Sequence, residues 1–166
     1  MADEANLFTT SWEFSFEGAS AARVGKRAGT ELLGATVYEL EPGAKWADLH
    51  FHHANEEMIV VLSGTPTVRT LDGDRELVTG EVVACPRGRP GAHCLENRSD
   101  ETARVLIVST KNMPEVIEYP ERDDAFVMSE PPYTEGSAEG ETRGRLLRVF
   151  HRADGAPVPP DPGTET

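Results

Sequence analysis

Hydrophobic residues along this chain fall into short runs, and Gly, Pro, Asp or Asn separates each run from the next. Runs of this kind that are rich in β-branched and aromatic residues are typical of β-strands. No segment has a convincing helical period of 3.6 residues, so the pattern predicts an all-β sandwich or barrel. The expected strands cover residues 7–17 (one or two strands), 34–40, 57–62, 65–71, 76–78, 82–85 and 103–109, with weaker candidates at 115–119 and 125–128.

Turn residues and alternation add detail to this pattern. Glu41-Pro42-Gly43 predicts a turn, because Pro presets φ and Gly tolerates a positive φ. Asp72-Gly73 predicts a tight hairpin. In the most apolar run, alternation places Glu57, Ile59 and Val61 on one face of a strand, so this carboxylate shares its side with two aliphatic residues.

The 166 residues suit a single domain. We expect N-terminal strands or an arm over residues 1–33, a barrel over 34–128, and a C-terminal loop and flexible tail over 129–166. Residues 129–144 are rich in Glu, Gly, Ser and Pro, which favours a loop. Within the tail, Arg145–Arg152 is a short apolar and basic patch that could dock on the barrel or on a second subunit.

The chain is strongly acidic. Asp and Glu number 29 against 16 Lys and Arg, which gives a formal net charge of −13. Such a surface repels nucleic acid and anionic membranes, so we expect neither as a partner. No stretch approaches the roughly 20 apolar residues that span a bilayer. A solvated acidic surface is the simplest interpretation of the charge.

The expected location is the cytoplasm. The N-terminus has no basic start followed by an apolar run, so no secretory signal is visible. Two cysteines, Cys85 and Cys94, are too few for a disulfide scaffold, and we expect reduced, buried thiols. A bridge between them is geometrically conceivable, since they flank one loop.

A basic island at Arg23, Lys26 and Arg27 interrupts a small and polar segment. Three cations this close together could hold an anion. They could equally be solvated, and the sequence leaves both interpretations open.

The densest candidate chemistry lies in residues 50–57, which hold three histidines and two glutamates. His50 and His52 share a face if the segment is extended, because side chains in a strand alternate. A turn at residues 53–55 then allows the carboxylate of Glu57 to return beside them, with Glu56 as the rival. Two imidazoles and one carboxylate suit a divalent metal of intermediate softness. His53 should point away from His52, toward the surface or behind the ligands.

A further ligand is available in residues 80–97, where His93 follows a Gly/Pro/Arg loop. Four of the five histidines therefore lie in one part of the chain. Cys94, its neighbour, should face the opposite side of the strand and is not expected to bind the metal.

These two stretches resemble the two motifs of the cupin superfamily, over about residues 34–110. The first motif reads Gly43, His50-x-His52, four residues, Glu57, six residues and Gly64. The second reads Gly80, five residues, Pro86-x-Gly88, four residues, His93, three residues and Asn97. The spacer between Gly43 and His50 is one residue longer than in the usual motif, and the Gly88–His93 loop is two residues longer.

The resemblance implies a small single-domain cupin, a double-stranded β-helix or jelly-roll barrel with one divalent transition metal. The metal ligands would be His50, His52, Glu57 and His93, and the six-residue gap to Gly64 favours Glu57 over Glu56. Iron, manganese, nickel, zinc, cobalt and copper all fit such a set. Two open positions on a six-coordinate ion would admit water, dioxygen or a chelating substrate.

The function that follows is a mononuclear metal-dependent enzyme, an oxygenase, isomerase or lyase, acting on a small organic molecule. The alternative is a non-catalytic module that binds a sugar or a carboxylate, and a purely structural metal is a third possibility. The resemblance also implies a homodimer. No catalytic residue can be assigned, although Tyr38 and Trp46 could line the pocket or simply pack.

Overall fold

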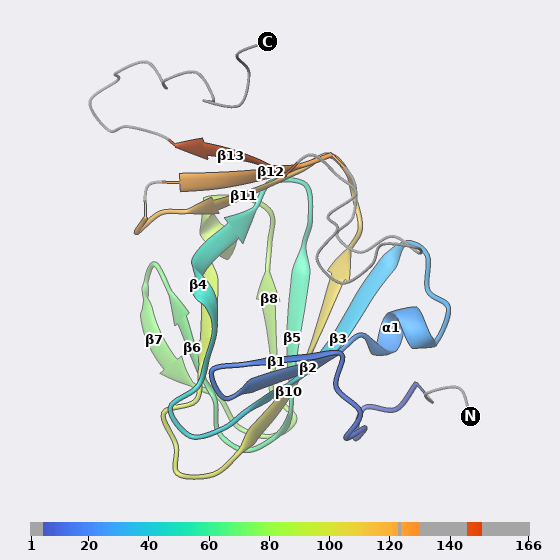
Figure 1. Cartoon of the computed structure of the whole chain (residues 1–166). Coiled ribbons are helices and arrows are strands. Elements are labelled where there is room, and N and C mark those ends of the chain that lie inside the picture. The colour runs from blue at the N-terminus through green and yellow to red at the C-terminus, as the bar shows by residue number, and fades with distance from the viewer. Residues whose placement is uncertain (1–4, 123, 130–145, 151–166) are drawn as a thin grey trace.

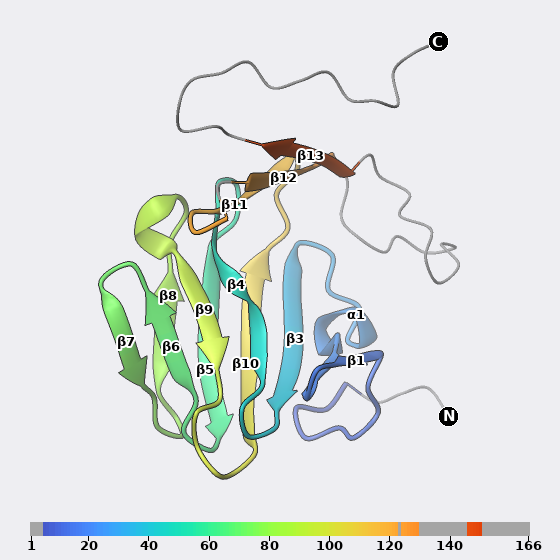
Figure 2. The ribbon, with the colours of Figure 1, turned by 60° about the vertical axis from the view of Figure 1, so that its left-hand side comes forward.

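The computed structural model of the chain describes residues 5–122, 124–129 and 146–150. Two antiparallel sheets face each other and enclose the core (Figures 1 and 2). This arrangement confirms the predicted all-β jelly-roll barrel in a single domain. The expected runs contain strands except at residues 76–78, where the strand covers Gly73–Glu76 and so begins and ends earlier than predicted.

The first sheet has the strand order β1-β2-β3-β10-β5-β8. Its central pairs are long, with β10 matched to β3 over its whole length and to β5 on the other side. Its strands are β1 (Phe14–Phe16), β2 (Ala19–Ala22), β3 (Leu33–Leu40), β10 (Ala103–Thr110), β5 (Glu57–Ser63) and β8 (Val82–Cys85).

The second sheet has the order β13-β12-β11-β4-β9-β6-β7. Three of its strands cross one end of the barrel, at the top of Figure 2. Its strands are β4 (Lys45–His52), β6 (Thr67–Thr70), β7 (Gly73–Glu76), β9 (His93–Glu96), β11 (Glu115–Tyr119), β12 (Asp124–Met128) and β13 (Leu146–Phe150). The Asp72-Gly73 hairpin joins β6 to β7 as predicted.

The main core lies between the inner faces of the two sheets. Its buried aliphatic residues come from both sheets and from the loops that close one end. In β5, Ile59 and Val61 are buried while Met58 is exposed, which confirms the predicted alternation. Gly64 ends this strand with a φ of 76°, and a Cβ there would lie 2.8 Å from Ala103 Cα. Glycine is required at that turn because the neighbouring backbone leaves no room for a side chain.

The N-terminal arm covers part of the outer face of the first sheet. A second core cluster forms where Ala22 and Val24 pack on Val37 of β3, with Trp12 against it. The short helix α1 (Val24–Arg27) lies here beside β3, a feature that the sequence did not predict. Four residues are too few to produce a detectable helical period.

The C-terminal strand β13 falls in the region that was expected to be loop and tail. Residues 146–150 pair with β12 over five positions, so this apolar run does dock on the barrel. An edge strand exposes unpaired backbone groups, and β13 satisfies those of β12. The rest of the predicted loop and tail, residues 130–145 and 151–166, lies outside the described residues.

Both cysteines are free and buried. No helix in the described part of the chain is long and apolar enough to cross a membrane. The homodimer stays a prediction.

Candidate functional site

Three potential ligand side chains meet at one end of the barrel. His50 and His52 come from the end of β4, and Glu57 comes from the start of β5, after the turn at residues 53–55. One donor atom from each of these residues lies within 4.8 Å of the others. Glu56 is not part of this group, and its side chain is exposed. The alternation of side chains in β4 and the turn that follows therefore bring His50, His52 and Glu57 together, as predicted from the sequence.

The approach of β4 to the site is irregular. Trp46 pairs with Leu95 of β9, whereas His50 pairs with His93, so β4 uses four residues where β9 uses two. Ala47, within this bulge, has a φ of 59°. A bulge absorbs extra residues and re-aims the side chains that follow. The bulge accommodates the long spacer between Gly43 and the histidines without changing the face on which they lie.

His93, at the start of β9, lies directly across from His50, and their ring centroids are 4.7 Å apart. Its Nε2 is 3.0 Å from Glu57 Oε2. His93 thus contacts the carboxylate of the group, although it is not one of the three residues whose donor atoms all lie within 4.8 Å.

Backbone carbonyls orient two of the imidazoles. His50 Nδ1 lies 2.8 Å from Asp48 O, and His93 Nδ1 lies 2.9 Å from Gly91 O. A carbonyl can only accept, so each Nδ1 carries the hydrogen and each Nε2 is the atom left to bind in the site. Second-sphere bonds of this kind fix the ring orientation of metal-binding histidines.

The carbonyl that orients His93 comes from the enlarged second loop. The residues between Gly88 and His93 form a 3-10 turn, η1 (Arg89–Gly91). A Cβ on Gly91 would lie 1.8 Å from Pro86 O, so only glycine allows this turn to fold against the preceding strand end. The two additional residues therefore build a support for His93.

The donor set fits a divalent metal. Both ring nitrogens of His52 are buried and lack a hydrogen-bond partner among the described residues. Its Nε2 lies 3.5 Å from Glu57 Oε2, and its Nδ1 lies 3.6 Å from Glu115 Oε2, which is too long for a hydrogen bond. Buried polar atoms are normally satisfied, and a metal ion at the Nε2 side would satisfy this ring.

The charge states of His50 and Glu57 also suit a metal. Burial, followed by the charges of His93 and His52, lowers the pKa of His50 to about 4, so this imidazole is neutral. Burial opposes ionisation of Glu57, yet the His93 hydrogen bond and the nearby imidazoles hold its pKa below the usual range. Burial also works to lower the pKa of His93, but hydrogen bonds to Cys85 and Glu57 outweigh it and raise that pKa to about 10. Metal binding at His93 therefore requires release of its proton.

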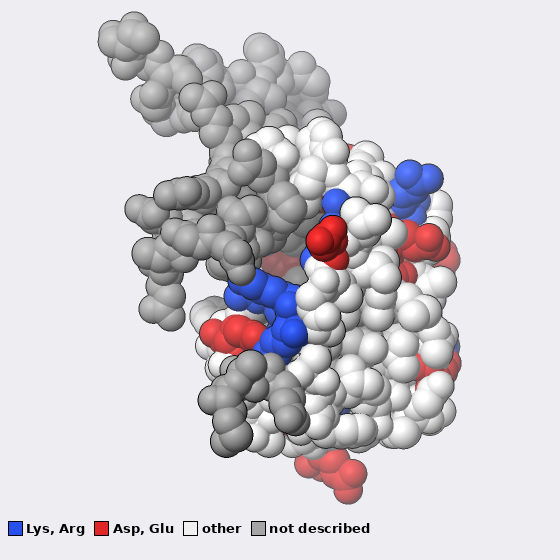
Figure 3. All heavy atoms as spheres, turned by 90° about the vertical axis from the view of Figure 1, so that its right-hand side faces the viewer, with Lys and Arg blue, Asp and Glu red and all other residues white. Residues whose placement is uncertain are grey.

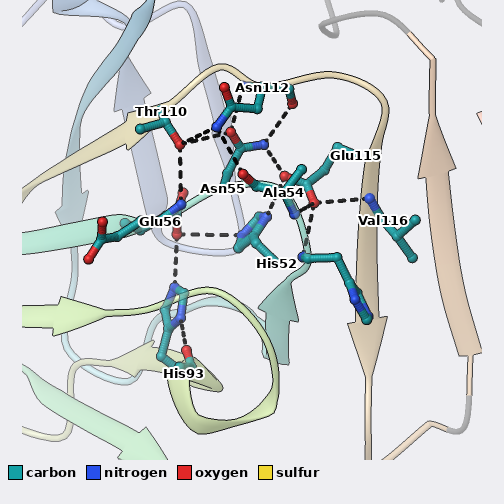
Figure 4. A network of polar contacts seen from close by, with 12 residues as sticks. His52, Ala54, Asn55, Glu56, His93, Thr110, Asn112, Glu115 and Val116 are labelled. Atoms are coloured by element: carbon teal, nitrogen blue, oxygen red, sulfur yellow. Dashed lines mark hydrogen bonds and ion pairs between the residues drawn. The ribbon is translucent and has the colours of Figure 1, made fainter.

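Sequence reasoning missed Glu115, which begins β11 and is buried beside His52. Its Oε1 accepts hydrogen bonds from the backbone N–H groups of His53 (3.1 Å), Ala54 (3.1 Å) and Val116 (2.9 Å), and Asn55 Nδ2 donates to Oε2 (Figure 4). Burial opposes ionisation of Glu115, but the contact with His52 and the hydrogen bonds from Ala54 and Asn55 outweigh it and keep the pKa of Glu115 below its usual value. The result is an ionised carboxylate fixed behind the ring of His52.

Asn55 connects the turn at residues 53–55 to the end of β10, in the first sheet, and to the residues that follow it. Its Oδ1 accepts from Thr110 Oγ1 (2.9 Å) and from Asn112 N–H (2.7 Å), and its Nδ2 also donates to Asn112 O (3.0 Å). The turn at residues 53–55 is thereby held against the connection from β10 to β11 (Figure 4). No local sequence pattern signals these partners, because they lie more than fifty residues away.

The remaining candidates lie where the alternation predicted. His53 points to the surface, where its Nε2 is 2.6 Å from Glu118 Oε1. Cys94 faces away from the ligands, and its Sγ–H donates to Ala47 O at 3.3 Å. Burial raises the pKa of Cys94 to about 12, so it is an unreactive thiol. Tyr38 and Trp46 face the interior, with ring centroids 4.3 Å apart.

A cavity of about 530 Å³ opens above the ligand group. Its size is within the usual range for small-molecule sites. Hydroxyl and amide side chains line its wall alongside apolar ones. The polar lining residues outside the ligand group include Thr36, Tyr38, Asn55, Ser109 and Thr110, and the charged ones are Arg23, Lys26, Lys111 and Glu115.

Comparisons with known proteins agree with this description. A family model described as Cupin domain matches residues 36–109. A sugar phosphate isomerase of the cupin superfamily from Silicibacter pomeroyi is 30% identical, with 84% of this chain and 80% of that chain covered and a TM-score of 0.67. Cupins commonly bind a divalent metal, and the group of His50, His52 and Glu57 meets that expectation.

Two more distant structures share the fold. One from Acidithiobacillus ferrooxidans is 23% identical, covering 79% of this chain and 75% of that chain, with a TM-score of 0.66. A polyketide cyclase from Streptomyces resistomycificus is 24% identical, covering 60% and 70%, with a TM-score of 0.52. A comparison with curated proteins finds no match.

Proposed function

This chain belongs to the cupin superfamily, and we propose that it is a metal-dependent isomerase of small hydroxy-carbonyl compounds of the sugar type. The observation that carries the proposal is a metal-binding group at the floor of a cavity whose walls present hydroxyl and amide groups. Such walls suit a polyol, because each hydroxyl of the ligand needs a hydrogen-bond partner when it leaves water. Among the three reaction classes that the sequence leaves open, the 30% identical sugar phosphate isomerase favours isomerisation.

The ligands in this proposal are His50, His52, Glu57 and His93. A bound divalent ion would polarise the carbonyl oxygen of the substrate and so acidify the neighbouring C–H. Isomerisation then moves one hydrogen from carbon to the adjacent carbon and one from the hydroxyl oxygen to the former carbonyl oxygen, so the carbonyl shifts by one carbon and substrate and product have the same formula. The cavity wall excludes bulk water from these atoms.

Tyr38 is the hydroxyl that we place against the substrate. Burial raises the pKa of its phenol well above the ordinary value, and the charge of Glu57 adds to the rise. The side chain therefore stays protonated and can donate a hydrogen bond to a substrate oxygen. Glu115 acts through His52, because its negative charge lies 3.6 Å from Nδ1 of that ring.

Metal analysis and isotope exchange test the proposal together. Protein purified without a metal-affinity tag should contain near-stoichiometric metal, and His50→Ala combined with His52→Ala should abolish it while the domain stays folded. In D₂O, the metal-loaded wild type should exchange the C2 hydrogen of aldoses such as glucose and ribose or of their phosphates, followed by NMR. The double variant should lose this exchange.

His53→Ala is the matched control, because this neighbouring histidine pairs with Glu118 at the surface. It should keep both the metal and the exchange. Unchanged metal content in the double variant would refute the ligand assignment. Sugar binding to the metal-loaded protein without exchange would identify a binding module, and oxygen consumption would identify an oxygenase.

A further inference from the structure

Three cationic side chains line the cavity at a level above the ligand group. Arg23 precedes α1, Lys26 lies within it, and Lys111 follows β10 directly. His50 and His93 are 8% and 3% exposed, whereas Arg23 and Lys111 are half-buried and Lys26 is exposed. The cations therefore stand toward the mouth, and the potential metal ligands stand at the floor.

Chain connections hold these cations on one side of the cavity. Lys111 N–H donates to Leu32 O at 3.1 Å, and its Nζ lies 3.3 Å from Thr30 O, in the segment that follows α1. This bridges the end of β10 to the arm that carries the other two cations. Lys and Arg side chains gather at the centre of the face on which α1 lies (Figure 3).

The charges of the two lysines are not compensated within the described part of the chain. Neither Lys26 nor Lys111 forms an ion pair with a described carboxylate. Arg27, the third member of the basic island, contrasts with them: Glu13 pairs with it at 2.8 Å, and it does not line the cavity. Of the three cations in the basic island, Arg27 therefore forms an ion pair with Glu13, whereas Arg23 and Lys26 line the cavity.

The cavity is locally basic in an acidic protein. The chain carries a net charge of −13, yet the described residues of the cavity wall include three cations against two carboxylates, Glu57 and Glu115. Both carboxylates belong to the histidine end, where they face His93 and His52. The two lysines face the space where a ligand would sit, and together with Arg23 they would focus the field on an anionic ligand.

We propose that the substrate carries a phosphate monoester, which Arg23, Lys26 and Lys111 hold while its hydroxy-carbonyl end reaches the histidines. This inference rests on the proposed function and adds the substrate class. A phosphate monoester carries close to two negative charges at neutral pH and accepts several charge-assisted hydrogen bonds, so it matches three cations better than a carboxylate does. One guanidinium and two ammonium groups are the donors typical of phosphate recognition.

The experiment measures binding of four probes to the metal-loaded full chain by calorimetry: ribose 5-phosphate, ribose, ribonate and inorganic phosphate. Ribose 5-phosphate should bind at least about tenfold more tightly than ribose, and the difference should shrink as salt is raised. The variant Lys26→Gln combined with Lys111→Gln should weaken ribose 5-phosphate binding about tenfold or more. Its affinity for ribose and its metal content should not change.

Arg75→Gln combined with Arg98→Gln is the control, since it removes the same charge from surface residues that do not line the cavity. It should leave ribose 5-phosphate binding within about twofold of wild type. If the two double variants weakened ribose 5-phosphate binding equally, the effect would depend on net charge alone, and the phosphate site would be overturned. Tighter binding of ribonate than of ribose 5-phosphate would also overturn it, in favour of a carboxylate.

The two proposals can fail separately. Exchange at C2 of ribose 5-phosphate that the lysine substitutions leave unchanged, together with unchanged binding of ribose 5-phosphate, would refute the phosphate site and leave the isomerase standing. Lysine-dependent binding of ribose 5-phosphate to a protein that holds no metal and exchanges no C–H would refute the isomerase and leave the phosphate site standing.

Discussion

The two ends of the barrel interior are built by the same strands and serve opposite purposes. In β5 the inward-facing residues run from Glu57 at the histidine end through Ile59 to Val61, and in β3, which runs in the same direction, they run from Thr36 through Tyr38 to Leu40. One end is filled by aliphatic side chains. The other holds imidazoles, carboxylates and a cavity of about 530 Å³.

The difference shows how one sheet architecture separates stability from chemistry. The aliphatic end buries apolar area, which is the main favourable contribution to folding. The histidine end buries polar groups, which destabilises a fold unless each one has a partner. Its partners are backbone carbonyls, the network around Glu115 and Asn55, and in our proposal a metal. Substitutions at the aliphatic end should therefore lower the free energy of unfolding, whereas substitutions at the histidine end should lower metal affinity.

The largest effect is expected at the aliphatic end, for Leu40→Ala. Leu40 is fully buried in the main core, and truncation of such a leucine lowers the free energy of unfolding by about 2–5 kcal/mol. Metal content of the folded variant should equal that of wild type, because Leu40 lies outside the ligand cavity. Urea unfolding and elemental analysis measure the two properties. Leu32→Ala, at an 81% exposed leucine, should change neither.

A smaller and different effect is expected at the histidine end, for Glu115→Gln. The change removes the charge behind His52, and loss of a partner of this kind weakens metal affinity about 10–100-fold. Chelator competition on the folded protein measures it. Glu118→Gln, at the surface partner of His53, should leave metal affinity unchanged.

A double-mutant cycle separates positioning from general destabilisation. If Glu115 acts through His52, then Glu115→Gln should weaken metal binding much less in a His52→Ala background than in the wild type. Equal weakening in both backgrounds would mean that Glu115 supports the fold of the turn and not the ring of His52.

The two ends were not equally accessible to sequence reasoning. Alternation in β5 and the His-x-His spacing predicted which residues share a face, because both depend only on neighbours within one strand. Glu115 could not be predicted, since its contacts to residues 53–55 cross about sixty positions of sequence. The sequence also could not assign the cations of the basic island, because only the packing of the arm beside β3 shows which of them line the cavity.

Irregular backbone limited the prediction in the same way. The extra residue before His50 was visible as a long spacer, but its location in a bulge after Trp46 depends on pairing with β9. Likewise, the extra residues before His93 give no sign that Gly91 O would orient that ring. Docking of β13 on β12 is a third case, because a short apolar run does not identify the edge on which it will pair.

The smallest expected effect lies at the boundary between the two ends, where Ile59 and Ile107 are paired neighbours. Both belong to the main core, but Ile107 also lines the cavity, whereas Ile59 does not. Replacement of a buried Ile by Val lowers the free energy of unfolding by about 0.5–1.5 kcal/mol, and the loss grows with the void that remains. Ile59→Val should fall near the upper value, because close-packed side chains surround the deleted methyl. Ile107→Val should fall near the lower value, because the deleted methyl only enlarges a space that already exists. Denaturant unfolding of both variants measures the difference, and equal losses would mean that the close-packed core extends up to the ligand group.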